Sequence, residues 1–112
     1  MAIYEFAGAS GVDPDDDLPE TGLLLKRSYP NPFGPSTTIS YSLPTQSHVR
    51  LGVYNVAGRE VAVIQDGVRE AGPHEASWDG ADGNGLQLGA GVYFVRLDAE
   101  GESRTSKMLL MR

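Results

Sequence analysis

The loop Trp78–Gly85 has the residue types of a calcium site. Asp79, Asp82 and Asn84 carry the side-chain oxygens that Ca²⁺ prefers, and the glycines between them permit a tight turn. The order departs from D-x-D-x-D-G and lacks the closing glutamate of the helix–loop–helix calcium site. Asp and Asn also accept hydrogen bonds from nearby backbone amides in ordinary turns. We therefore expect a turn here, with a bound calcium ion as the alternative and no other cofactor.

Serine, histidine and aspartate are all present, so a hydrolytic triad has to be considered. The sequence has no G-x-S-x-G elbow, and no strand-to-helix turn is available to carry one. His48 and His74 are isolated on expected strands, where nothing nearby in the sequence would orient either ring. Tyr54 is the aromatic residue expected to face solvent, and a single exposed ring is weak support for sugar binding. The sequence therefore predicts that the chain is not an enzyme.

The net charge of −6 comes from the first part of the chain. Residues 1–25 hold six acidic residues and no Lys or Arg, whereas residues 26–112 hold nine acidic and nine basic residues. Asp13, Asp15 and Asp17 alternate, but no glycine follows to fold them around a cation, so we expect a solvated linker. A neutral body without a basic stripe argues against nucleic-acid binding.

Residues 1–21 and 22–112 differ in composition and are expected to form an arm and a domain. There is no cysteine, and no apolar run is long enough to span a bilayer. The start of the chain lacks the pattern of a signal peptide, so we expect either a cytoplasmic protein or a piece of a longer exported one. Ile3, Tyr4 and Phe6 could form a short strand on the acidic, proline-containing linker.

Strand signals recur every 8–12 residues after residue 22, and no window offers a convincing helical stripe. About seven short alternating strands predict an all-β fold, an immunoglobulin-like antiparallel β-sandwich. The expected strands are Leu23–Arg27, Thr37–Leu43, His48–Asn55, Arg59–Gln65, His74–Trp78, Gly91–Asp98 and Thr105–Met111.

Apolar residues at every second position predict which side chains fill the space between the sheets. Prolines flank one of these strands, and we expect Pro30, Pro32 and Pro35 to keep the chain extended where it crosses from one strand, or one sheet, to the next. Pro44 would end the ladder. The expected core residues are Tyr41, Val49, Leu51, Val53, Trp78, Tyr93, Val95 and Leu97.

Three stretches together are more specific than any single motif. They are YPNPFGPSTTISYSLP (29–44), VRLGVYNVAGREVAVI (49–64) and WDGADGNGLQLGAGVYFVRL (78–97). They resemble the immunoglobulin-like C-terminal sorting domain of the type IX secretion system, and the similar domain of the flagellar hook-capping protein. The ending KMLLMR (107–112) resembles the tail that closes such sorting domains.

The resemblance implies which residues would take part in sorting. Pro30, Asn31, Pro32 and Phe33 match the early family motif, Gly91 and Tyr93 match its G-x-Y motif, and Lys107 through Arg112 match the terminal signal. Gly34 departs from the family, which often has asparagine there, and so does the Met111-Arg112 ending.

These observations predict a non-catalytic secretion and cell-surface anchoring domain of an exported bacterial protein. Its partner would be the outer-membrane secretion machinery, and its location extracellular or at the cell surface. One alternative is an extracellular structural subunit that assembles with identical subunits by donating residues 1–10 as a strand. A second alternative is an accessory module of a secreted hydrolase, which would bind carbohydrate or stabilise its neighbour.

Overall fold

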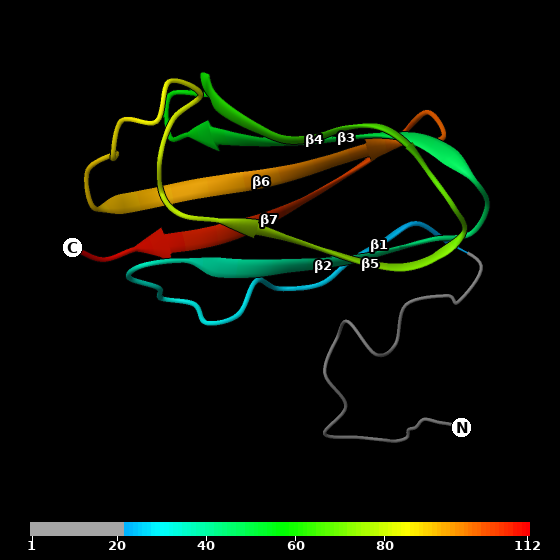
Figure 1. The fold of residues 1–112 in the computed structure, drawn as a ribbon, viewed down its shortest axis with the longest axis horizontal. Helices are drawn as coiled ribbons and strands as arrows, with labels where there is room; N and C mark the ends of the chain where they lie inside the picture. Colours follow the sequence, from blue (N-terminus) through cyan, green and yellow to red (C-terminus); the bar gives the residue numbers. More distant parts are fainter. Residues whose placement is uncertain (1–21) are drawn as a thin grey trace.

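The computed structural model describes residues 22–112, which form two antiparallel sheets packed face to face (Figure 1). The sheet orders are β1-β2-β5 and β4-β3-β6-β7. These two sheets confirm the predicted all-β sandwich. Among residues 22–112 there is no helix long and apolar enough to cross a membrane. The strands are β1 (Leu24–Leu25), β2 (Thr37–Leu43), β3 (Ser47–Asn55), β4 (Glu60–Arg69), β5 (Gly72–Trp78), β6 (Gly91–Ala99) and β7 (Glu102–Leu110).

Alternation of apolar and polar residues decides which side of each strand is buried. In β2, Ile39, Tyr41 and Leu43 point between the sheets, and the intervening residues are half-exposed. The same period of two continues through β3 and β6. All eight expected core residues are buried, and Phe33, Met108 and Leu110 join them.

The strand bounds differ from the predicted ones mainly in β1, β4 and β7. β1 is only two residues long, β4 continues four residues past Gln65 to Arg69, and β7 begins three residues before Thr105, at Glu102. Gly67 lies inside β4, opposite Val49 of β3. β3 is nine residues long, and its pairing with β4 keeps the residues around Gly67 in a strand although glycine has a low strand propensity.

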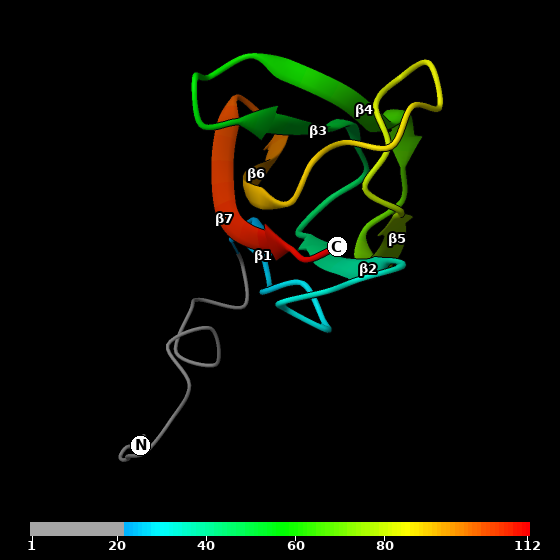
Figure 2. The ribbon, with the colours of Figure 1, turned by 90° about the vertical axis from the view of Figure 1, so that its left-hand side faces the viewer.

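The sheet that contains β4 differs from that of the constant-type immunoglobulin domain. In the constant-type immunoglobulin domain the fourth strand belongs to the sheet of the first, second and fifth strands. Here β4 pairs with β3, and register shifts occur at Leu51/Gly52 and at Val53/Tyr54. As a result, β4 and β7 are the two edges of the four-stranded sheet (Figure 2).

The proline-rich segment crosses from one sheet to the other, as expected. Tyr29 forms a bridge with Thr38 of β2, and Phe33 forms a parallel bridge with Leu110 of β7. The expectation that the prolines keep this segment extended is wrong, because the chain bends at 30–32 and again at 34–35. The Tyr29-Pro30 and Asn31-Pro32 peptide bonds are both cis.

Candidate functional site

The segment 31–33 holds the C-terminal strand along its outer edge. Asn31 Nδ2 donates to the Lys107 carbonyl at 3.0 Å, and the Leu109 amide donates to Asn31 Oδ1 at 3.0 Å. Phe33 continues the ladder, since its amide donates to Leu109 O at 3.0 Å and its carbonyl accepts from the Met111 amide at 2.8 Å. The Asn31 side chain therefore takes the place of a peptide group beside β7. We call Asn31, Phe33, Lys107, Leu109, Met111 and Arg112 the C-terminal clasp.

The Phe33 ring anchors this segment in the core. Its centroid lies 5.6 Å from that of Trp78, and Trp78 in turn lies 5.4 Å from Tyr93 in an edge-on arrangement. The Trp78 indole donates to the carbonyl of Ala81 at 2.9 Å, so its polar atom is satisfied although the ring is buried. The early motif and the G-x-Y motif thus meet through one aromatic cluster.

Tyr93 stands at the start of β6 and closes the loop before it. Its hydroxyl donates to the carbonyl of Gly89, four residues upstream, at 2.7 Å. This is the tyrosine corner known from immunoglobulin-like sandwiches. Gly91 has a φ of 153°, a backbone conformation open to glycine and not to other residues. Both residues of the motif therefore have a clear structural role at this corner.

Arg112 ties the end of the chain to the loop between β5 and β6. Its Nε donates to Leu88 O at 2.8 Å and its Nη2 donates to Gly80 O at 3.0 Å. Gly80 has a φ of +77°, and a Cβ there would come within 2.8 Å of Arg112 Nη2. A glycine at position 80 therefore leaves room for the terminal guanidinium.

The outer side of the clasp is an apolar and basic strip. Leu109 is 39% exposed, Met111 is 57% exposed, and Lys107 lies between Leu109 and the middle of β7. Tyr29 is 80% exposed at the entry to the segment. The sequence had instead indicated Tyr54 as the exposed aromatic residue; it is half-buried, and its hydroxyl donates to Glu60 at 3.0 Å. The local sequence around Tyr29 does not predict that its side chain is exposed, because the exposure depends on the bend of the chain that begins at Pro30.

Asp79, Asp82 and Asn84 lie in a turn whose own backbone uses their oxygens. Asp79 Oδ1 accepts from the Ala81 amide, and Asp82 Oδ1 accepts from the amides of Asn84 and Leu86. Within residues 22–112 no group of three or more His, Asp or Glu side chains could hold a metal ion. The turn interpretation accounts for each of these contacts.

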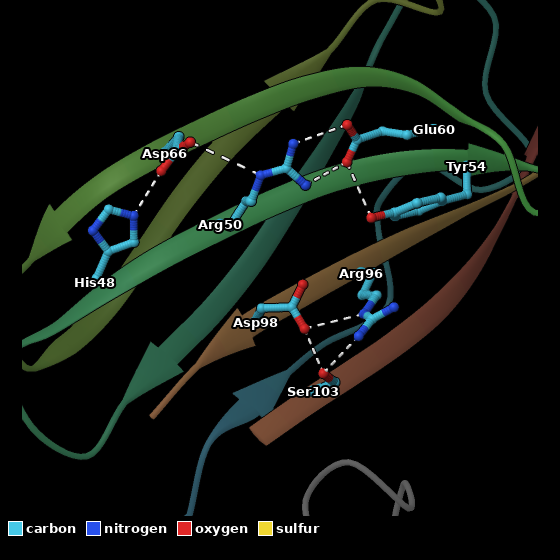
Figure 3. A network of polar contacts seen from close by, with 8 residues as sticks. All are labelled: His48, Arg50, Tyr54, Glu60, Asp66, Arg96, Asp98 and Ser103. Atoms are coloured by element: carbon cyan, nitrogen blue, oxygen red, sulfur yellow. Dashed lines mark hydrogen bonds and ion pairs between the residues drawn. The ribbon is translucent and has the colours of Figure 1, made fainter. Parts of the chain in front are cut away.

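Charged side chains on the outer face of the four-stranded sheet form two separate clusters (Figure 3). In the first, His48 Nε2 lies 2.6 Å from Asp66, and Arg50 lies between Asp66 and Glu60. The hydrogen bonds from Arg50 hold the pKa of Glu60 below its usual value, and burial raises the pKa of Tyr54.

Gly52 makes room for this first cluster, since a Cβ there would meet Glu60 Oε2 at 2.9 Å. In the second cluster, Arg96 donates to Asp98 and Ser103, and Ser103 also donates to Asp98. These are paired surface charges in mutual contact. His74 lies apart from both clusters, stacked on Tyr41, and its Nε2 is 2.7 Å from the carbonyl of Glu70.

Ile3, Tyr4 and Phe6, which the sequence singled out for strand donation, lie outside the described residues. The remaining predicted site residues all lie in the sandwich. Pro30, Pro32 and Asn31 form the bend, Phe33 enters the core, and Lys107 and Arg112 belong to β7 and the residues after it. Sequence positions 30–33, 91–93 and 107–112 are thus brought together in one region.

Comparisons with known proteins agree with this fold. A family model described as the FlgD Ig-like domain matches residues 33–103. FlgD from P. aeruginosa is 27% identical, with a TM-score of 0.54, over 66% of this chain and 59% of FlgD. Dimeric latent PorU from Porphyromonas gingivalis is 22% identical with a TM-score of 0.64, over 92% of this chain and 10% of PorU.

PorZ of the same organism, an essential bacterial surface component of the type IX secretion system, is 22% identical with a TM-score of 0.54. That match covers 92% of this chain and 13% of PorZ, so the chain spans only a small part of either Porphyromonas protein. No curated protein matches the chain. Because the family model covers more than half of its length, the chain belongs to the FlgD Ig-like domain family.

Proposed function

We propose that this chain is the C-terminal secretion and cell-surface anchoring domain of an exported bacterial protein, with a non-catalytic role. The observation that carries the proposal is the C-terminal clasp. Two motif-like stretches more than seventy residues apart are joined by four hydrogen bonds, two made by the Asn31 side chain and two by the Phe33 backbone. The end of the chain is thereby part of the folded domain.

The clasp presents the tail in one defined conformation. Met108 and Leu110 are fully buried, so the strand cannot rotate without exposing them to water. Alternation then places Leu109 and Lys107 on the outer face, and Met111 continues past the end of β7. A secretion receptor would find the same apolar and basic strip on every folded copy, whatever protein precedes the domain.

Two further observations support a role in recognition. The described body carries nine acidic and nine basic residues, so nothing in its charge favours a nucleic acid. The likeness to PorZ is one of fold, and PorZ is a surface component of the type IX secretion system. We infer from this that the partner is outer-membrane secretion machinery.

The test is to fuse residues 22–112 behind a fluorescent reporter in a bacterium that has a type IX system. The reporter should reach the cell surface or the medium. Substituting the exposed tail residues, Leu109→Ser with Met111→Ser, should leave the reporter in the periplasm, because these side chains form the strip and contribute little to the core.

The matched control changes two apolar residues elsewhere that are more exposed than Leu109 and Met111. Val56→Ser with Leu86→Ser removes side chains that are 74% and 67% exposed, and secretion should continue. The thermal unfolding midpoints of both purified double mutants should stay close to that of the unmodified domain. A reporter that remains in the periplasm with the unmodified domain would contradict the proposal.

A further inference from the structure

A hollow of about 280 Å³ opens on the outer face of the four-stranded sheet, at the end of β3. Two aromatic residues line it, because Tyr54 of β3 pairs with Phe94 of β6 in the ladder. Both side chains are half-buried, whereas Val56, in the turn after β3, is 74% exposed. We call this the aromatic hollow. Its lining includes Tyr54, Asn55, Val56, Phe94, Arg96 and Thr105.

Contacts on both sides keep the aromatic hollow open. The Tyr54 ring leans across Gly52 toward β4, since a Cβ on Gly52 would lie 3.4 Å from Tyr54 Cε1 and the Tyr54 hydroxyl donates to Glu60 at 3.0 Å. On the neighbouring strand, Arg96 Nε donates to Asp98 at 3.0 Å (Figure 3). Both side chains are thus held by other contacts, and the floor of the hollow stays uncovered.

Asn55 contributes a side-chain amide whose orientation is fixed. Its Oδ1 accepts from the backbone amides of Ala57 and Arg59, both at 3.0 Å, in the turn after β3. These bonds leave Nδ2 as a donor without a hydrogen-bond partner in the part of the chain that the structure describes. Thr105, which is exposed on β7, adds a hydroxyl. The aromatic hollow therefore combines two rings with a few positioned polar groups.

A second hollow, of about 400 Å³, adjoins the first, because Asn55 lines both. We call it the polar hollow. Its hydrogen-bonding side chains include Arg59, Asp82 and Asn84, which together offer donors and acceptors. The two charges among them are of opposite sign, and the other acidic residue of this hollow, Glu60, is already paired with Arg50. The polar hollow therefore does not favour a strongly charged ligand.

We propose that the two hollows bind a neutral oligosaccharide, with one sugar ring in the aromatic hollow and the next in the polar hollow. The C–H groups on one face of a sugar ring pack on the flat apolar surface of an aromatic ring, which Tyr54 and Phe94 supply. The sugar hydroxyls donate and accept hydrogen bonds, and Asn55, Thr105 and the side chains of the polar hollow provide the partners. A purely apolar ligand would leave these polar groups unpaired.

The sequence had offered only Tyr54 as an aromatic residue for sugar binding, and a single ring is weak support. The ladder between β3 and β6 places a second ring, that of Phe94, in the same hollow. The inference goes beyond the proposed secretion function and does not depend on it. It would give the exported protein a point of attachment to polysaccharide.

The test titrates the isotope-labelled 112-residue chain with cellotetraose, maltotetraose and chitotetraose, and follows its backbone amide signals by NMR. Each sugar is added to about 10 mM, so that a dissociation constant near 1 mM is still measured. We expect at least one of these neutral sugars to bind. The amide signals that shift should be those of Asn55, Asn84, Phe94 and Thr105, which line the two hollows.

Two conservative variants each remove one feature of the site. Phe94→Leu keeps an apolar side chain without the flat ring, and Asn55→Asp keeps the Oδ1 acceptor of the turn without the Nδ2 donor. Each should weaken binding about tenfold or more, as the loss of a central contact does. The matched control, Tyr29→Leu, removes a ring that is 80% exposed outside both hollows, and it should bind as the unmodified chain does.

Three results would overturn the inference. None of the three sugars could shift any amide signal at the highest concentration, or the shifted signals could lie away from both hollows. Alternatively, Phe94→Leu and Asn55→Asp could bind as tightly as the unmodified chain. Thermal unfolding shows whether each variant is folded, and if one is not, the positions of the shifted amides in the unmodified chain still decide.

Discussion

Replacing Asn31 by alanine tests whether the clasp holds the end of the chain. The substitution removes two hydrogen bonds, one to Lys107 O and one from the Leu109 amide, both at 3.0 Å. A single hydrogen bond contributes about 0.5–1.5 kcal/mol net. Because this pair is exposed to solvent, we expect a loss of about 1–2 kcal/mol in the free energy of unfolding. For a domain of this size that lowers the unfolding midpoint by roughly 4–16 °C.

Amide hydrogen exchange locates the effect within the molecule. The Met108 amide faces β6, opposite Tyr93, and keeps its partner, so its exchange should become faster only by the factor of about 5–30 that follows from the global loss of about 1–2 kcal/mol. The Leu109 amide points away from β6 and loses its acceptor, Asn31 Oδ1, so its exchange should become faster than that of Met108 by a clear margin. Asn31→Asp keeps the acceptor for the Leu109 amide but loses the donor to the Lys107 carbonyl. The exchange rate of the Leu109 amide in this variant should therefore lie between the rates in the unmodified domain and in Asn31→Ala.

The control is Asn84→Ala, which changes an exposed asparagine in the turn after Asp82. Only its backbone amide is used there, so the free energy of unfolding should stay within about 0.5 kcal/mol of the unmodified value. If Asn31→Ala left the exchange rate of the Leu109 amide unchanged, the side chain would not be holding the strand, and the clasp would lose its physical basis.

Three further predictions concern the core, the surface charges and the end of the chain. Trp78→Ala or Tyr93→Ala should cost about 3–5 kcal/mol and Tyr93→Phe only about 1 kcal/mol, measured by urea unfolding; equal costs for the two Tyr93 variants would contradict this account of its hydroxyl. The pKa of Glu60 is lowered in the folded state, so its stabilising effect is complete above the unfolded value near 4.5 and is lost as pH falls through the folded value. Glu60→Gln should therefore reduce the loss of stability as pH falls below about 4.5, and an unchanged acid transition would count against the Arg50–Glu60 contact. Arg112→Ala should free Leu88 O and Gly80 O and make the loop 79–90 more sensitive to proteolysis, as judged against Lys26→Ala; equal cleavage rates would show that Arg112 does not tie the loop.

The burial of the Tyr93 ring could be predicted from the sequence, whereas the role of its hydroxyl could not. Its place in an alternating run predicted a buried ring, and the structure confirms this. Its hydroxyl bond to Gly89 O closes a loop, and the geometry of that loop depends on where β5 ends and β6 begins. Resemblance to a family marked the residue, but only the fold explains why the side chain is a tyrosine.

The clasp could not be predicted in the same way. Asn31 had no visible partner in the sequence, because Lys107 and Leu109 lie 76 and 78 residues away. The prolines around it indicated a boundary, and extended chain was the expectation. The bend arises where the segment leaves the Thr38 bridge and meets β7, a contact between distant parts of the chain.

The sequence by itself determined the strands from β2 onward and their buried faces, because an alternation of apolar and polar residues has only one favourable orientation against a core. Sheet membership was decided by tertiary structure. β4 pairs with β3, continues through Gly67, and leaves β4 and β7 as the edges, because backbone pairing depends on which strands become neighbours. The local sequence determines whether a segment favours a strand, whereas the packing of the whole sandwich determines which strand it pairs with.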